Sequence, residues 1–133
     1  MVAAPDKNGF TPRILVVDDD ESLRSMLQEV LTDAGYEVLC ACDGKAAMKL
    51  YLQHTPDLVV TDLIMPTQEG LETILQMRRT NVAVKIIAIS GGGHVAAKDY
   101  LAVAEKCGAN RTLTKPFTPQ EILAAIKGVL NEP

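Results

Sequence analysis

Short apolar runs alternate along the chain with longer segments in which apolar residues recur every three or four positions. The runs have the length of buried strands, and the longer spacing is that of an amphipathic helix. The predicted strands are the runs 14–17, 36–41, 58–61 and 86–89 and the short stretch 112–114. Because strand and helix patterns alternate five times, the sequence predicts an α/β fold in which five helices cover both faces of a five-stranded parallel sheet.

Helix start and stop signals support this alternation. The first helix stops at Gly35, a second runs from its cap Asp43 through Leu52, and a fourth ends at Gly108. The last helix begins at residues 118–121, which combine a capping box with proline at the first helical position. The predicted apolar faces are Leu23, Met26, Leu27, Val30 and Leu31; Ala47, Leu50 and Tyr51; Leu71, Ile74 and Leu75; Tyr100, Val103, Ala104 and Cys107; and Ile122, Ile126 and Val129.

Length and composition predict one soluble domain over residues 13–131, preceded by a flexible leader over residues 1–12. The 133 residues are 47% hydrophobic and 23% charged, and the net charge of -4 argues against nucleic acid as a direct ligand. No apolar stretch approaches the roughly 18 residues of a membrane span, so we expect no membrane insertion and a cytoplasmic location. Cys40, Cys42 and Cys107 are expected to be buried reduced thiols, with the first two facing one side of a strand.

Polar side chains follow four of the predicted strands. Residues 18–20, all aspartate, come directly after the first strand, and Asp62, Ser90 and Lys115 follow the third, fourth and fifth. The carboxyl ends of parallel strands meet at one edge, and ligands bind there at the point where the strand order reverses. In the order 2-1-3-4-5, typical of a flavodoxin-like doubly wound sheet, strands one and three flank that point and carry the aspartates.

Carboxylates gathered at one edge repel one another, and a hard cation with oxygen ligands neutralises them. Mg²⁺ fits best, because it takes one or two carboxylates and shares its remaining positions with water and phosphate. Lys115 offers a positive charge for phosphate, and Ser90 offers a hydroxyl donor. Singly, each of these residues has a simpler explanation as a turn or surface residue, and Asp20 is expected only to cap the first helix.

Five segments in this order resemble the receiver domain of two-component response regulators over residues 13 to 131. They are Ile14-Leu15-Val16-Val17-Asp18-Asp19-Asp20, Asp62-Leu63-Ile64-Met65-Pro66, Gly70, Ser90 and Lys115-Pro116-Phe117. The resemblance implies that Asp62 accepts a phosphoryl group from a phosphohistidine on a sensor histidine kinase or histidine phosphotransfer protein. The chain would thereby catalyse its own phosphorylation and dephosphorylation at Asp62, without being a conventional turnover enzyme.

The resemblance also implies the ligands of the cofactor Mg²⁺. Asp19, Asp62 and the backbone carbonyl of Ile64 would bind the ion directly, and Asp18 would act through water. Lys115 would pair with Asp62 at rest and with the phosphoryl oxygens afterwards, where the Ser90 hydroxyl would also donate a hydrogen bond. A downstream protein would bind the surface of the fourth helix, fifth strand and fifth helix. Because the chain ends near the last helix, it resembles stand-alone receivers of the chemotaxis-regulator type, and an excised fragment remains an alternative.

Three positions depart from the receiver pattern. Thr112 stands where an aromatic switch residue is common, Gly91 follows Ser90 where alanine is usual, and Gly92 and Gly93 lengthen the next loop. We expect ordering of that loop and the following helix to replace the ring movement. Ile64 and Gly92 provide no polar side chain to orient water, so a very short-lived aspartyl phosphate is not expected. The departures keep open a second hypothesis, a receiver-like binding module that works without phosphorylation.

Overall fold

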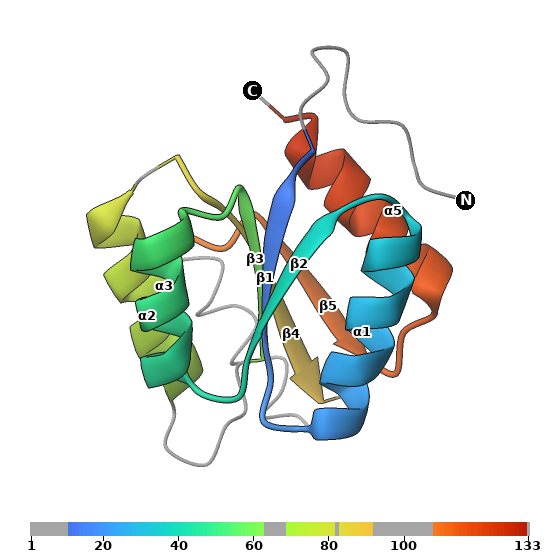
Figure 1. Ribbon diagram of the computed structural model, residues 1–133, viewed down its shortest axis with the longest axis horizontal. Coiled ribbons are helices and arrows are strands. Elements are labelled where there is room, and N and C mark those ends of the chain that lie inside the picture. The colour runs from blue at the N-terminus through green and yellow to red at the C-terminus, as the bar shows by residue number, and fades with distance from the viewer. Residues whose placement is uncertain (1–10, 63–68, 82, 92–107, 133) are drawn as a thin grey trace.

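Five parallel strands form one sheet in the order β2-β1-β3-β4-β5 (Figure 1). The computed structural model describes residues 11–62, 69–81, 83–91 and 108–132. The strands are β1 (Arg13–Val17), β2 (Glu37–Ala41), β3 (Leu58–Asp62), β4 (Lys85–Gly91) and β5 (Arg111–Lys115). The helices are α1 (Glu21–Asp33), α2 (Gly44–His54), α3 (Glu69–Thr80) and α5 (Pro119–Leu130). The predicted parallel sheet and its strand order are confirmed, and the fourth predicted helix, with Tyr100, Val103, Ala104 and Cys107, lies outside the described residues.

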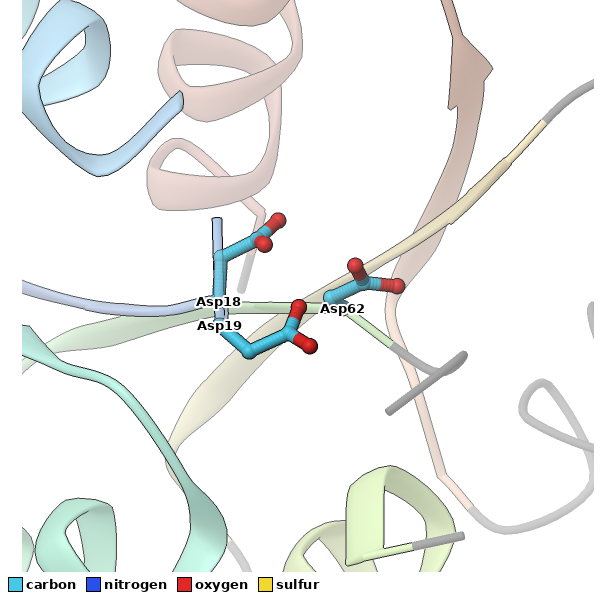
Figure 2. A group of neighbouring side chains, drawn as sticks. All are labelled: Asp18, Asp19 and Asp62. Atoms are coloured by element: carbon cyan, nitrogen blue, oxygen red, sulfur yellow. The ribbon is translucent and has the colours of Figure 1, made fainter. Parts of the chain in front are cut away.

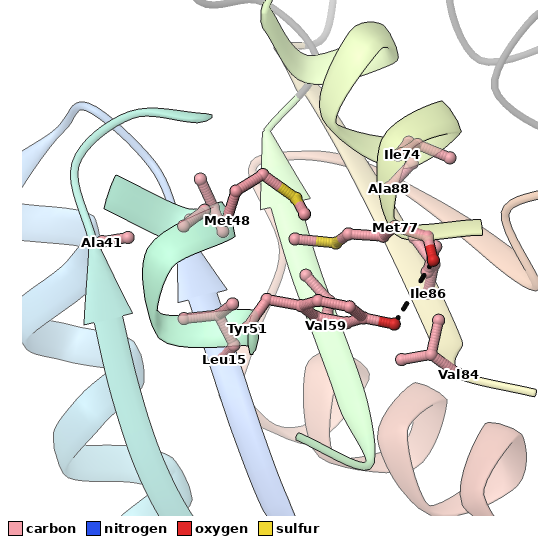
Figure 3. Close-up of a cluster of buried hydrophobic side chains, with 12 residues drawn as sticks. Leu15, Ala41, Met48, Tyr51, Val59, Ile74, Met77, Val84, Ile86 and Ala88 are labelled. Atoms are coloured by element: carbon pink, nitrogen blue, oxygen red, sulfur yellow. Dashed lines mark hydrogen bonds between the residues drawn. The ribbon is translucent and has the colours of Figure 1, made fainter. Parts of the chain in front are cut away.

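Helices cover both faces of the sheet, with α1 and α5 on one side and α2 and α3 on the other (Figure 1). Successive strand residues point to opposite faces, so each strand supplies two cores. Leu15 and Val59 pack with α2 and α3, in the cluster that Figure 3 shows, whereas Ile14 and Val60 pack with α1 and α5. This two-sided burial explains why the inner strands β1, β3 and β4 are largely apolar, whereas the edge strands β2 and β5 are mostly half-buried.

The helices begin at the residues that the sequence indicates. Asp20 caps α1 by accepting hydrogen bonds from the backbone of Ser22 and Leu23, and Asp43 caps α2. Thr118 and Glu121 form both bonds of the capping box at the start of α5. Each cap stabilises its helix by about 1 kcal/mol. Because α1 starts directly after the acidic triplet, its cap also fixes where that triplet leaves the sheet.

Side-chain burial differs from the predictions at several positions. Cys42 is exposed, since β2 ends at Ala41 and the chain then turns toward α2, and Cys40 is only half-buried. Cys107 lies outside the described residues. Leu75 is 41% exposed because Met77, three residues after Ile74, takes the inward position on α3. None of the helices in the described part of the chain has the length and apolar character needed to span a lipid bilayer.

Gly108 is held in a left-handed conformation against Arg78. Its φ of +113° is one that side chains disfavour, and a Cβ there would lie 2.9 Å from Arg78 Nε. The Arg78 guanidinium cannot easily move away, because it donates to the carbonyls of Val84 and Gly108 and to the side chain of Asn110. We therefore expect Gly108→Ala to lower the free energy of unfolding by about 1–3 kcal/mol, measured by urea denaturation.

Gly128 provides the matched control for this substitution. It lies inside α5, and an added Cβ would meet mainly the flexible end of Arg111, 3.0 Å away. Alanine is the better helix former by up to about 1 kcal/mol, so Gly128→Ala is expected to leave stability unchanged or slightly raised. Equal losses for the two variants would contradict the conformational argument for Gly108.

Candidate functional site

Three carboxylates gather at the carboxyl edge of the sheet (Figure 2). Asp18 and Asp19 directly follow β1, and Asp62 is the last residue of β3, the neighbouring strand. One oxygen from each of the three side chains lies within 4.8 Å of the others. Asp18 and Asp62 are buried, whereas Asp19 is exposed and faces solvent. The strand order therefore brings Asp19 and Asp62, which are 43 residues apart in the sequence, to the same edge of the sheet.

Lys115 joins this cluster from the end of β5. Its Nζ lies 2.9 Å from Asp62 Oδ2 and 3.1 Å from Asp18 Oδ2. The side chains of Asp18 and Asp62 are 2% and 4% exposed, and that of Lys115 is 27% exposed, so solvent screens these ion pairs less than surface ones. The resemblance to receiver domains implied the pair with Asp62, but the second pair with Asp18 was not predicted.

Burial, hydrogen bonds and the charges of the cluster together shift the pKa values of two of its members, Asp18 and Lys115. Burial raises the pKa of the Asp18 carboxyl above its ordinary 3.8; the Asp20 N–H opposes this shift, and the charge of Asp62 adds to it. Burial by itself lowers the pKa of Lys115, but its hydrogen bonds and charge interactions with Asp62 and Asp18 outweigh burial and raise that pKa above 10.5. The charged form of Lys115 is thus stabilised by both buried carboxylates. The same ammonium does not fully offset the cost of burying the Asp18 charge.

Backbone contacts hold the acidic triplet in place. The Asp18 N–H donates to the Ala41 carbonyl at 3.1 Å, which extends the β1–β2 pairing by one residue. The Asp20 N–H donates to Asp18 Oδ1 at 2.8 Å, and Arg24 Nη1 donates to the Asp18 carbonyl at 2.7 Å. Sequence reasoning missed Arg24. Its only signal is a basic residue one turn after the helix cap, where it can reach back to the preceding strand end.

The remaining predicted residues lie on the neighbouring strands or outside the described residues. Ser90 is fully buried near the end of β4 and lies opposite Thr114, next to Lys115, in the sheet register. Asp62 lies opposite Ile89, the residue that precedes Ser90 on β4. Ser90 is therefore one residue closer to the acidic edge of the sheet. Thr112 is half-buried on β5 opposite Ala88. The positions of Ile64, Gly92 and Gly93 lie outside the described residues.

The donor set suits a hard divalent cation. Three carboxylate oxygens converge within 4.8 Å, and when all three groups are ionised the single charge of Lys115 leaves the cluster negative. Carboxylate oxygens are the ligands that Mg²⁺ prefers, and an exposed Asp19 leaves one side open for water or phosphate oxygens. The residues present therefore fit the magnesium ion that the sequence implies.

The family model for the response regulator receiver domain matches residues 14–127, so the chain belongs to that family. Among curated proteins, the chain is 36% identical over 118 residues to the chemotaxis protein CheY of Thermotoga maritima, covering 88% of this chain and 96% of that protein. It is also 36% identical over 118 residues to the alkaline phosphatase synthesis transcriptional regulatory protein PhoP of Bacillus subtilis, covering 89% of this chain. The chain spans about half of PhoP, 48% of its length.

Solved structures agree with this assignment. The chain superposes on a putative response regulator from Chloroflexus aurantiacus with a TM-score of 0.82 and 31% identity, covering 92% of this chain and 99% of the other. The chemotaxis protein CheY4 of Vibrio cholerae gives a TM-score of 0.80 and 30% identity, with 90% and 98% covered. The resemblance to receiver domains is thereby confirmed.

Proposed function

We propose that this receiver, over residues 13–131, takes a phosphoryl group from a phosphohistidine onto Asp62 and thereby switches the binding of a partner protein in the cytoplasm. The observation that supports this most directly is the contact of Lys115 with Asp62, 2.9 Å long, inside a cluster of carboxylates. The buried Asp62 carboxylate supplies the acceptor oxygen, and the ammonium beside it is already placed to stabilise the negative charge of the phosphoryl group. The donor is a sensor histidine kinase or a histidine phosphotransfer protein.

In the proposed step an Asp62 oxygen attacks phosphorus as the bond between phosphorus and the imidazole nitrogen breaks. The new oxygen–phosphorus bond forms on Asp62, and the electron pair of the broken bond returns to the imidazole. The ammonium of Lys115, already 2.9 Å from this carboxylate, then pairs with the phosphoryl oxygens. The buried Ser90 hydroxyl donates a hydrogen bond to one of them. Most of the rate enhancement comes from positioning and charge neutralisation.

The metal ligands proposed here are the carboxylates of Asp19 and Asp62 and the backbone carbonyl of Ile64, with Asp18 acting through water. When bound, Mg²⁺ supplies positive charge that reduces repulsion between the donor phosphate and the acceptor carboxylate. The convergence of Asp18, Asp19 and Asp62 oxygens supports this assignment. The output surface is proposed to be β5, α5 and the helix expected before Gly108.

Incubation with acetyl phosphate and Mg²⁺, followed by intact mass measurement, tests this function. We expect the wild type to gain the mass of one phosphoryl group and to lose it again on prolonged incubation. Asp62→Asn removes the acceptor oxygen with little change in shape and is expected to gain nothing. Chelation of the metal should abolish the gain in the wild type. A wild type that stays unmodified under these conditions would favour the alternative, a binding module that works without phosphorylation.

A further inference from the structure

Arg24 reaches from α1 back to the end of β1, and the proposed function above gives it no role. Its Nη1 donates to the Asp18 carbonyl at 2.7 Å, and its own backbone N–H donates to the Asp20 carbonyl at 3.0 Å. The side chain is half-buried between the helix and the acidic edge. The side-chain contact ties the first turn of α1 to the peptide that links Asp18 to Asp19, and the backbone contact is the first hydrogen bond of the helix itself.

We infer that Arg24 is a positioning residue for the metal site, because it fixes the peptide plane from which the Asp19 side chain projects. This inference rests on the proposed magnesium site. The Asp18 N–H is held by Ala41 and the Asp18 carbonyl by Arg24, so the backbone entering Asp19 is bonded on both sides. Asp20 is fixed in turn, since its N–H donates to Asp18 Oδ1 and its side chain caps α1.

The guanidinium contributes at this place through geometry more than through charge. A positive charge near three carboxylates weakens cation binding, so removal of that charge alone would tighten the binding of Mg²⁺. Removal of the hydrogen bond instead frees the Asp18–Asp19 peptide and requires Asp19 to be ordered again when the ion binds. The two effects have opposite signs, and the sign of the change in affinity therefore separates them.

The inference is tested by titrating metal-free protein with MgCl₂ in a calorimeter. Groups that orient metal ligands commonly contribute 10- to 100-fold to affinity, and because Arg24 contacts backbone we expect Arg24→Met to raise the Kd for Mg²⁺ by about tenfold. Methionine keeps the aliphatic stem and therefore most of the packing. Arg24→Lys, which retains the charge but loses the planar fork, should raise the Kd by about threefold. Arg79→Met, an exposed change of equal charge near the end of α3, should leave the Kd unchanged.

Acetyl phosphate kinetics give a second measurement for the same variants. A positioning role raises the Mg²⁺ concentration that gives half the maximal rate, while the rate at saturating Mg²⁺ stays close to that of the wild type. A general loss of structure would lower the saturating rate as well and would appear in urea denaturation. Should Arg24→Met fail to fold, Arg24→Lys decides by itself: a Kd raised about threefold supports the inference, and an unchanged Kd overturns it.

The inference and the proposed function fail in different ways. Unchanged or tighter Mg²⁺ binding by Arg24→Met overturns the positioning role, even if the wild type is phosphorylated normally. A wild type that binds Mg²⁺ but is not phosphorylated overturns the proposed function, while the calorimetric comparison of the variants still decides the role of Arg24. A wild type that binds no Mg²⁺ overturns both.

Discussion

Lys115→Met is expected to lower the free energy of unfolding by about 2–3 kcal/mol in metal-free buffer at pH 7. Removal of one partner from a buried ion pair typically costs about 3–5 kcal/mol, because the remaining charge is left uncompensated. The expected value here is somewhat smaller, since the Lys115 side chain is 27% exposed and partly screened. Two buried carboxylates, of Asp18 and Asp62, would lose their shared cation.

Urea denaturation with and without Mg²⁺ measures this effect. The added ion should restore part of the lost stability, since it neutralises the same carboxylates and binds only the folded state. In the acetyl phosphate assay at saturating Mg²⁺, loss of the ammonium should slow phosphorylation about a hundredfold, as removal of a preorganised charge stabiliser commonly does. Lys49→Met, an exposed change on α2, should stay within about 0.5 kcal/mol of the wild type.

The pH dependence of stability gives an independent check on Lys115. Its pKa is raised above the ordinary 10.5 in the folded protein, mainly through Asp62 once the opposing effect of burial is overcome. The stabilisation from this group is therefore complete below about pH 10 and is lost as the pH rises through the folded pKa. Lys115→Met should not show this alkaline loss. An equal stability of the two proteins at pH 7 would contradict the bridging role.

The residues at the carboxyl edge of the sheet could be predicted from the sequence, because the strands and the residues that end them are both recognised from local patterns. Buried parallel strands read as apolar runs, and the polar residue after each run marks its carboxyl end. Asp62 and Lys115 come together because β3, β4 and β5 are consecutive neighbours in the sheet. The helix caps at Asp20 and Asp43 are equally local, since each bonds to backbone within three residues.

The details inside the site could not be predicted, because they depend on side-chain geometry between distant segments. Lys115 and Asp18 are 97 positions apart, and the sequence does not say which of several carboxylates an ammonium will reach. In the sequence, Arg24 cannot be distinguished from any other charged residue on a helix. Its contact with the Asp18 carbonyl depends on how the chain bends between β1 and α1. Cys42 is exposed because β2 ends at Ala41, as the run 36–41 predicts, so that Cys42 lies beyond the strand and not on its buried face. Leu75 became exposed because the inward face of α3 follows Ile74 and Met77.

Asp18→Asn is expected to raise the free energy of unfolding of the metal-free protein by about 1 kcal/mol at pH 7, the size of a typical single-residue effect. The pKa of Asp18 is raised in the folded state, chiefly by burial, so its ionised form opposes folding. Asparagine removes the charge and can still accept the Asp20 N–H at Oδ1, but its Nδ2 then replaces the oxygen that accepts from Lys115. Lys115 keeps its contact with Asp62. In Mg²⁺ the order should reverse, because the wild type binds the ion more tightly and gains more stability from it.

The sign of the pH dependence distinguishes this explanation from a general packing effect. A group whose pKa is raised on folding contributes stability that is present below its unfolded value, 3.8 for Asp18, and is lost as the pH rises through the folded value. The advantage of Asp18→Asn should therefore be largest at pH 7 and should disappear as the pH approaches 4. Glu29→Gln, an exposed change of equal charge on α1, should show no such trend. A constant difference between Asp18→Asn and the wild type from pH 4 to 7 would assign the effect to packing instead of charge.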